Sequence, residues 1–165
     1  MELSGQVLFS ATPSAVWSAL FDPEVLKLCI PGCKGVERKS DCEYIATMAV
    51  KVGPLNASFS GSIALVDPEY PTAVTLTGAL QSGAAGFAKG QARITLRPVD
   101  NATELQYLAE MRIGGKLAAV GDRLFGSAVK RNIIDFFTAF EAQIASATAA
   151  AGASDPTPLA ASDLI

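Results

Sequence analysis

Residues 55–65, "LNASFSGSIAL", alternate between apolar or glycine positions and polar positions. The odd-numbered positions run from Leu55 through Phe59 to Leu65, and the even-numbered positions from Asn56 to Ser62 are asparagine or serine. Successive side chains of a β-strand point to opposite faces of its sheet. The stretch therefore predicts a strand with one face in a protein core and the other in water.

The same alternation returns on both sides of this stretch. Residues 3–11 predict a first strand, and from residue 36 to residue 114 strand follows strand, with turn signals at Gly53-Pro54, Asp67-Pro68 and Tyr70-Pro71. Clear period-two segments cover residues 44–50, 74–80, 88–96 and 105–113. One wet face and one buried face in every segment indicate an antiparallel sheet of about seven strands.

Three helices complete the predicted elements. Thr12 before Pro13 and Asp22 before Pro23 are typical N-cap and first-turn pairs, so two short helices follow the first strand. After residue 115 apolar residues recur at steps of three and four, which predicts a long amphipathic helix. Gly121 lies inside it, as does Gly126, and each costs about 1 kcal/mol against alanine, so we expect a kink or break near them.

The order of these elements predicts an α+β fold. Only the long C-terminal helix can cover the apolar face of the sheet, so the curved sheet must wrap around it in a helix-grip arrangement. We expect one folded ligand-binding domain over residues 1–146. Residues 147–165 are rich in alanine, proline and serine, and we expect a frayed helix end and a flexible tail there.

Small residues interrupt the predicted buried face in mid-strand. They either let the strands bend or leave an apolar space under the helix, and the second interpretation predicts a ligand-sized cavity. The Tyr107 hydroxyl needs a partner on that face and could be a polar contact for a ligand. The small residues are Gly5, Ala46, Ala57, Gly61, Gly78, Gly90, Ala92 and Ala109. The predicted ligand-binding residues are Leu26, Ile30, Met48, Val50, Phe59, Leu76, Phe87, Tyr107, Met111, Leu124 and Phe137.

Composition excludes several classes of function. A net charge of −3 offers no basic face for nucleic acid, and no run of 18 apolar residues could form a transmembrane helix. The N-terminus lacks the basic start and apolar run of a signal peptide, so we expect a cytoplasmic protein. The chain contains no histidine, which removes the usual general base, and no acidic residue falls on the predicted buried face. We therefore predict no catalytic residues.

Cys29 and Cys33, with Cys42, form the only cluster of soft metal ligands. A structural zinc needs four ligands, and no histidine can supply the fourth. Three residues separate the first two thiols where a redox pair has two, and Pro31-Gly32 lies between them. Metal binding and a reversible disulfide remain alternatives, but we expect buried structural thiols near the mouth of the cavity, and no metal site.

Two glycine-rich segments could be mistaken for phosphate-binding loops. Residues 83–90 lead into a strand rather than a helix, and residues 114–117 open a helix but lack the serine or threonine of a P-loop. We interpret both as hinges, which could also serve as a gate for a ligand.

Four stretches resemble one known family. "PSAVWSALFDPEVLKLCIPGCKGVE", "VGPLNASFSGSIAL", "GAAGFAKGQARITL" and "IGGKLAAVGDRL" are similar to the CoxG family of carbon monoxide dehydrogenase subunits, which falls in the START-like, birch-pollen-allergen-like (SRPBCC) superfamily. The resemblance covers about residues 1–146. It implies a helix-grip fold around an apolar cavity, in agreement with the predicted elements.

The resemblance also implies a function. It implies a non-enzymatic accessory protein that serves a molybdenum-containing dehydrogenase of the carbon monoxide dehydrogenase type. The implied cargo is a hydrophobic small molecule, held non-covalently, such as an isoprenoid quinone or a lipid. Some family members carry a long C-terminal membrane-binding extension; the tail here is short and contains Pro156 and Pro158, so we expect at most peripheral contact with the inner face of the membrane. A ligand-free assembly module and a START-like cyclase or hydrolase are the alternatives.

Overall fold

The computed structural model describes the backbone of residues 1–154 and the side chains of residues 1–147. Within residues 1–154, seven strands and four helices follow one another in the predicted order, and only α3 was not predicted as a separate helix. The elements are β1 (Glu2–Phe9), α1 (Pro13–Leu20), α2 (Pro23–Cys29), β2 (Cys33–Ser40), β3 (Glu43–Val52), β4 (Leu55–Glu69), β5 (Ala73–Ser82), β6 (Gly86–Val99), β7 (Ala102–Gly114), α3 (Lys116–Ala119) and α4 (Asp122–Ser154).

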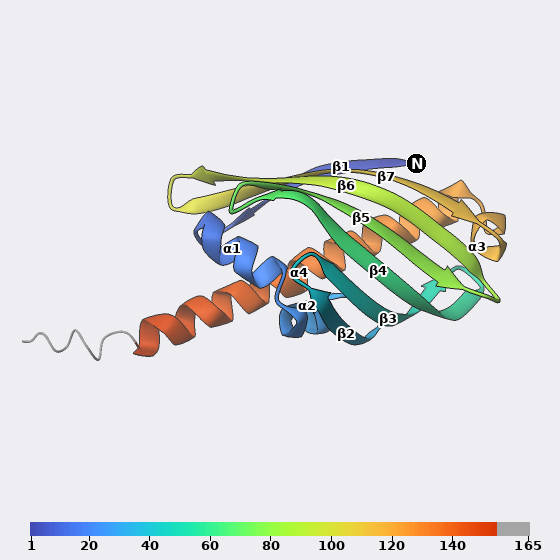
Figure 1. Cartoon of the computed structure of the whole chain (residues 1–165), viewed down its shortest axis with the longest axis horizontal. Coiled ribbons are helices and arrows are strands. Elements are labelled where there is room, and N and C mark those ends of the chain that lie inside the picture. Colours follow the sequence, from blue (N-terminus) through green and yellow to red (C-terminus); the bar gives the residue numbers. More distant parts are fainter. Residues whose placement is uncertain (155–165) are drawn as a thin grey trace, which may run out of the picture.

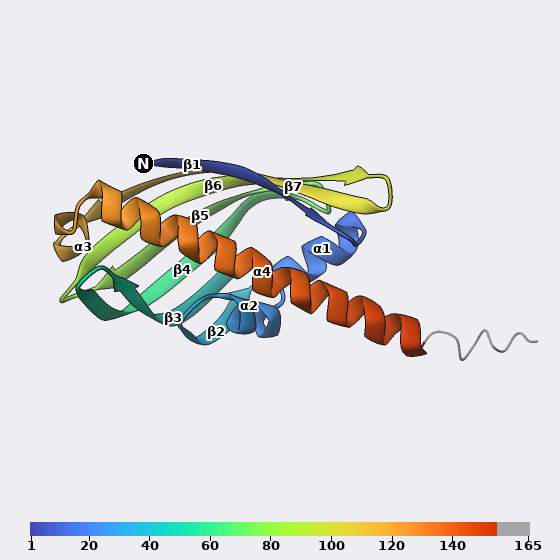
Figure 2. The same cartoon turned by 180° about the vertical axis from the view of Figure 1, so that it is seen from behind.

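The strands form one antiparallel sheet in the order β1-β7-β6-β5-β4-β3-β2. The sheet is strongly curved, and α4 runs diagonally along its concave side, as the two opposite views show (Figures 1 and 2). Helix α4 packs closely on α2 and on β1 and β3, which lie toward the two edges of the sheet. The predicted helix-grip fold is confirmed.

The sequence signals at the helix ends act as predicted. The Thr12 hydroxyl accepts a hydrogen bond from the Ala15 amide at 3.3 Å, and the Asp22 carboxylate accepts one from the Glu24 amide at 2.9 Å. Each bond satisfies an amide that has no partner inside the first turn of its helix. These caps, with a proline directly after each, fix the starts of α1 and α2.

The predicted break in the C-terminal helix lies at Gly121. This glycine separates α3 from α4 and has a φ of +95°, which favours glycine over other residues. Gly126 lies within α4 and interrupts nothing. Helix α4 continues to Ser154, past the expected domain boundary at residue 146, so residues 147–154 of the predicted tail are helical. The rest of that tail, residues 155–165, lies outside the described residues. No described helix is long and apolar enough to cross a membrane.

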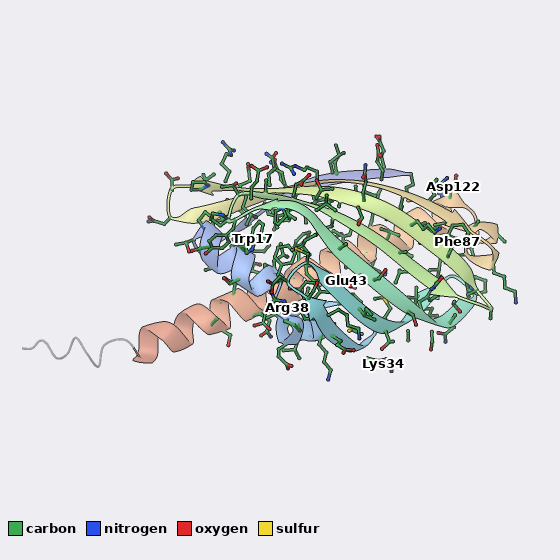
Figure 3. The ribbon with its side chains drawn as sticks, in the orientation of Figure 1. Trp17, Lys34, Arg38, Glu43, Phe87 and Asp122 are labelled. Carbon is green, nitrogen blue, oxygen red and sulfur yellow. The ribbon has the colours of Figure 1, made fainter. Side chains whose placement is uncertain are left out.

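The described residues form three buried clusters; the smallest contains Tyr44, Leu65 and Val74, and the two larger ones lie at opposite ends of the molecule. We name them by the nearest helix, and Figure 3 marks the two ends by Trp17 and Phe87. Both cores bridge the sheet and α4, so they hold the helix away from the centre of the sheet. The α1-end core contains Phe9, Val16, Leu20, Cys29, Leu96, Leu105, Phe140 and Ile144. The α3-end core contains Val52, Phe59, Ala85, Ala88, Leu117 and Phe125.

Candidate ligand-binding cavity

The register of the sheet gathers small residues between the two cores. Gly78 of β5 lies opposite Gly90 of β6, so two neighbouring strands lack a side chain at the same level. One level away Gly61 of β4 lies opposite Ala46 of β3, and on the other side Ala92 lies opposite Ala109. These positions share the concave face because the register pairs them with one another and successive side chains of a strand point to opposite faces.

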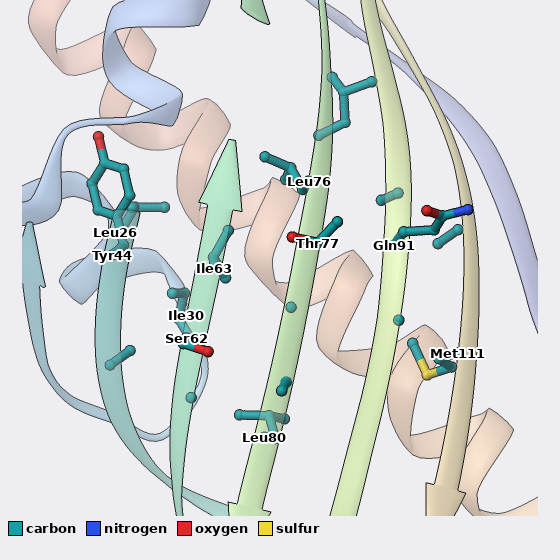
Figure 4. A pocket seen from close by; sticks show the side chains of 18 of the residues that line it. Leu26, Ile30, Tyr44, Ser62, Ile63, Leu76, Thr77, Leu80, Gln91 and Met111 are labelled. Atoms are coloured by element: carbon teal, nitrogen blue, oxygen red, sulfur yellow. The ribbon is translucent and has the colours of Figure 1, made fainter. Parts of the chain in front are cut away.

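A cavity of about 440 Å³ occupies this space between the sheet and α4. Its walls come from β2–β7, from the end of α1, from α2 and from α4, and Figure 4 shows the side chains around it. The size lies within the range of small-molecule sites, about 300–1,000 Å³. The predicted ligand-sized cavity is therefore present, and it lies over the small residues.

Six of the predicted ligand-binding residues line this cavity. One comes from α2, one is the residue directly after α2, three come from the sheet and one comes from α4. They are Leu26, Ile30, Met48, Leu76, Met111 and Phe137.

Four predicted residues lie elsewhere. Phe59 is buried in the α3-end core, and Val50 packs against that core. Leu124 is exposed on the first turn of α4, beside Gly53. Phe87 lies on the convex side of β6, and the Lys89 ammonium lies 5.5 Å from the centre of its ring. Figure 3 labels Phe87 at the α3 end of the molecule.

Tyr107, the predicted polar contact, also lies outside the cavity lining. Its ring packs on Phe137 with 5.8 Å between the ring centres, and its hydroxyl lies over Gly5 of the neighbouring strand. A side chain on Gly5 would collide with this ring. Gly5 thus makes room for a tyrosine across the strand pair, and it does not contribute to a cavity.

Tyr44 is the tyrosine that faces the cavity. Its hydroxyl donates a hydrogen bond of 2.6 Å to the Phe21 carbonyl, which satisfies the buried O–H group. Burial raises the pKa of Tyr44 above its ordinary value of 10.0, so the phenol stays neutral at physiological pH. The alternation in residues 44–50 already placed Tyr44 on the buried face.

The cavity wall is otherwise apolar. Lys89 and Glu110 border it, but both alternate with inward-facing residues and are exposed on the convex side. Among the described residues, Tyr44 is therefore the one ionisable side chain that faces the cavity. An acid–base pair, which most hydrolytic and cyclising chemistry needs, does not line the described cavity.

The three cysteines lie in different surroundings. Cys29 is buried in the α1-end core rather than at the cavity mouth, where we predicted it, and burial raises the pKa of its thiol above 9.0. Cys33 donates a weak hydrogen bond of 3.6 Å to the Gly35 carbonyl at the start of β2. Cys42 is exposed beyond the far end of β2, so the length of this strand, about 25 Å, separates it from Cys33. Within residues 1–154, acidic, cysteine and histidine side chains form no group that could hold a metal ion.

The glycine-rich segments are sites of close backbone approach. The Leu117 amide donates a hydrogen bond of 2.9 Å to the Ala85 carbonyl, which ties α3 to the turn between β5 and β6. Gly86 lies directly against the backbone of Gly114, where any side chain would collide. The two segments therefore pack against each other and close the α3 end of the fold.

The architecture and the cavity define a protein with the START-like helix-grip fold. The fold is shared with a START superfamily protein from Mycobacterium smegmatis (17% identity, 88% of this chain and 97% of that chain, TM-score 0.66). It is also shared with the Zhui aromatase/cyclase from Streptomyces sp. R1128 (15% identity, 87% and 93%, TM-score 0.63). At such identities the likeness concerns the fold alone.

The chain belongs to the CoxG family of carbon monoxide dehydrogenase subunits, whose family model matches residues 5–145. A conserved protein from Geobacillus kaustophilus is 31% identical over 88% of this chain and 96% of its own, with a TM-score of 0.82. No curated protein is similar enough in sequence to count as a match. The family predicted from the four sequence stretches is confirmed.

Proposed function

We propose that this protein is a non-enzymatic carrier that binds a hydrophobic small molecule in the central cavity and serves a molybdenum-containing dehydrogenase of the carbon monoxide dehydrogenase type. The cargo is an isoprenoid quinone or a similar lipid, held without a covalent bond. The protein works in the cytoplasm, with peripheral contact to the inner face of the membrane. The family supports the accessory role, because its description names a subunit of carbon monoxide dehydrogenase.

The observation that carries this proposal is the apolar cavity of about 440 Å³ between two well-packed cores. Burial of apolar ligand surface yields about 25 cal/mol per Å², which drives uptake without any specific polar contact. A cavity of this size accommodates a chain or ring system of roughly 15–20 carbon atoms at the usual interior packing density of about 0.74.

The polar contacts of the cavity favour a ligand that is mostly hydrocarbon. The hydroxyl proton of Tyr44 already bonds the Phe21 carbonyl, so it is not free for a ligand carbonyl. A buried carbonyl without a donor costs about 1–3 kcal/mol. We therefore expect an apolar tail inside the cavity and the polar ring of a quinone toward its opening. Tyr107 would then pack against the ring of Phe137, which lines the cavity, and would not contact the ligand itself.

The experiment fills the cavity with one side chain. Ala92 lines the cavity on β6, and Ala64 lies on the convex side of β4, outside the cavity lining. We expect the wild-type protein and Ala64→Trp to take up menaquinone or ubiquinone in native mass spectrometry, and Ala92→Trp to lose uptake by at least about tenfold. A wild-type protein that takes up neither quinone nor lipid, from its host or in vitro, would refute the proposal.

The alternative of a ligand-free assembly module predicts a different result. Such a module would retain its dehydrogenase partner in a pull-down from the native host whether the cavity is filled or not, and it would show no ligand at all. A carrier retains the partner but fails to support electron transfer in the Ala92→Trp variant, while Ala64→Trp supports it.

A further inference from the structure

Among the described residues, charged side chains are paired at one end of the molecule and mostly unpaired at the other. The four ion pairs of the described part of the chain all involve β2, the end of β4 and the ends of β6 and β7 away from α3. Arg97 contacts Glu104 at 2.7 Å and Arg93 contacts Glu69 at 3.7 Å. Basic and acidic residues thus compensate each other at this end.

The opposite end is formed by α3 and the segments beside it. Lys116 begins α3, and Lys89 and Arg112 lie opposite each other on β6 and β7. Arg123 follows on the first turn of α4, and Lys51 lies near the end of β3. We call these five residues the basic tip; all are exposed, and none of them forms an ion pair with a described residue.

The five basic residues of the tip outnumber the three acidic residues near them. Asp122 lies within the tip, and Glu2 and Glu110 border the same surface hollow as Lys89 and Arg112. Lys89 and Arg112 form a directly opposite like-charge pair on an exposed sheet face, and the neighbouring Glu110 offsets one of these two charges. An anionic surface would relieve the remaining repulsion.

Exposed apolar side chains accompany these charges. Phe87 is 38% exposed and Leu124 is 47% exposed, and each lies within two residues of a member of the basic tip. Figure 3 shows Phe87 and Asp122 at the same end of the molecule, whereas Trp17 lies toward the other. Basic residues mixed with aromatic and aliphatic side chains are typical of proteins that bind at a membrane interface.

We propose that the basic tip docks onto a membrane surface that contains anionic lipid headgroups. The five charges come from β3, β6, β7, α3 and the start of α4 and surround exposed Phe87 and Leu124, and this spread over one whole end fits an extended anionic lipid interface. An acidic protein surface is the other outcome that the test distinguishes. The described end of α4, at Ser154, lies at the far end of the molecule (Figures 1 and 2), so this surface is separate from the described end of α4. The proposal specifies the membrane contact proposed above and does not depend on which ligand the cavity binds.

The test uses the full chain and flotation with lipid vesicles. We expect binding to phosphatidylcholine vesicles that contain roughly one third phosphatidylglycerol, little binding to pure phosphatidylcholine, and a loss of binding as salt rises. The triple variant Lys89→Glu, Arg112→Glu and Lys116→Glu should bind at least about tenfold more weakly. Phe87→Ala should weaken binding about two- to threefold, because less apolar surface enters the interface.

A second triple variant makes the same change in net charge at the other end. It replaces Lys39, Arg93 and Arg97 by glutamate, and it should keep its vesicle binding to within about twofold. Equal losses in the two triple variants, or no binding of the wild-type protein to anionic vesicles at low salt, would overturn the proposal. The proposal would also be overturned if the basic-tip variant kept its vesicle binding and lost only its capture of the dehydrogenase in a pull-down. Quinone uptake is measured in parallel for the basic-tip variant and the wild-type protein. Uptake retained by the variant shows that its cavity is intact. No uptake by the wild-type protein would refute the carrier function but not the docking surface.

Discussion

The centre and the α1 end of the sheet are built on the same strands but are filled in opposite ways. In the α1-end core Leu96 of β6 lies opposite Leu105 of β7, and both are buried. Four residues along the same two strands, Ala92 lies opposite Ala109 and the space above them is empty. Backbone, register and helix are shared, so side-chain volume alone distinguishes a packed core from a cavity.

This difference separates stability from function within one fold. The packed end holds α4 on the sheet through contacts such as the edge-to-face pair of Phe9 and Phe140, whose ring centres are 5.2 Å apart. The centre contributes less burial and keeps room for a ligand. Substitutions at the two places should therefore affect different measurements, and the following predictions test that separation.

The largest difference is expected between two leucines of the two regions. Leu96→Ala should lower the free energy of unfolding by about 3–4 kcal/mol, because it opens a new void in a close-packed core. Leu76→Ala should cost about 1–2 kcal/mol, because Leu76 packs on Tyr44, Leu65 and Val74 on one side but already borders empty space on the other. Urea unfolding followed by circular dichroism measures both. Equal losses would mean that the centre is packed as tightly as the end.

Two glycines on opposite strands sharpen the comparison at the backbone level. A Cβ on Gly90 would collide with the Glu110 carbonyl and the Met111 backbone, so Gly90→Ala should destabilise by about 1–3 kcal/mol. A Cβ on Gly78 would lie 3.3 Å from the Ser62 carbonyl and 3.7 Å from the Ile63 side chain, so Gly78→Ala should cost less than about 1 kcal/mol. Thermal melts give the order of the two variants. The reverse order would contradict the strand geometry described here.

The fold was predictable because each of its elements has a strong local signal. Period two along β3–β7, the capped prolines of α1 and α2, and the change of period after Gly115 left one arrangement for the sheet and helix. The cavity was predictable from the glycines and alanines on the buried face. The individual residues that line the cavity were harder to predict, because a period of two gives the face of the sheet on which a residue lies but not its position along the strand relative to the cavity.

The misplaced residues illustrate this limit. Phe59 lies on the predicted face, but it is a buried member of the α3-end core, so it fills a core and not the cavity wall. Tyr107 is on the right face too, yet its level is that of Gly5, whose missing side chain makes room for it. Leu124 was assigned to the wall from helical spacing, but the break at Gly121 turns the first residues of α4 toward Gly53. Register and helix phase are set by tertiary contacts, which a single sequence does not reveal.

Alkaline pH should weaken the cavity wall at Tyr44 and the α1-end core at Cys29. Burial raises both pKa values in the folded state, above 10.0 for Tyr44 and above 9.0 for Cys29. The unfolded chain therefore loses these protons first and binds fewer protons than the folded chain, so the free energy of unfolding falls as pH rises above 9.0. Tyr44→Phe should cost about 1 kcal/mol at neutral pH through the lost hydrogen bond to Phe21, and its stability should fall less steeply with pH. A slope unchanged in this variant would exclude Tyr44 as its source.

The smallest effects are expected at the two cysteines outside the cores. Cys33→Ser and Cys42→Ser should each change the free energy of unfolding by less than about 0.5 kcal/mol, since the first side chain is half-buried at a strand end and the second is exposed. Cys29→Ser should cost about 1–2 kcal/mol, because a hydroxyl would replace a thiol in an apolar core. Quinone uptake should be the same in all three variants, because none of the three residues lines the described cavity. Loss of uptake in both Cys29→Ser and Cys33→Ser would instead restore the metal or disulfide hypothesis, and would show that the packed end and the open centre are coupled through these thiols.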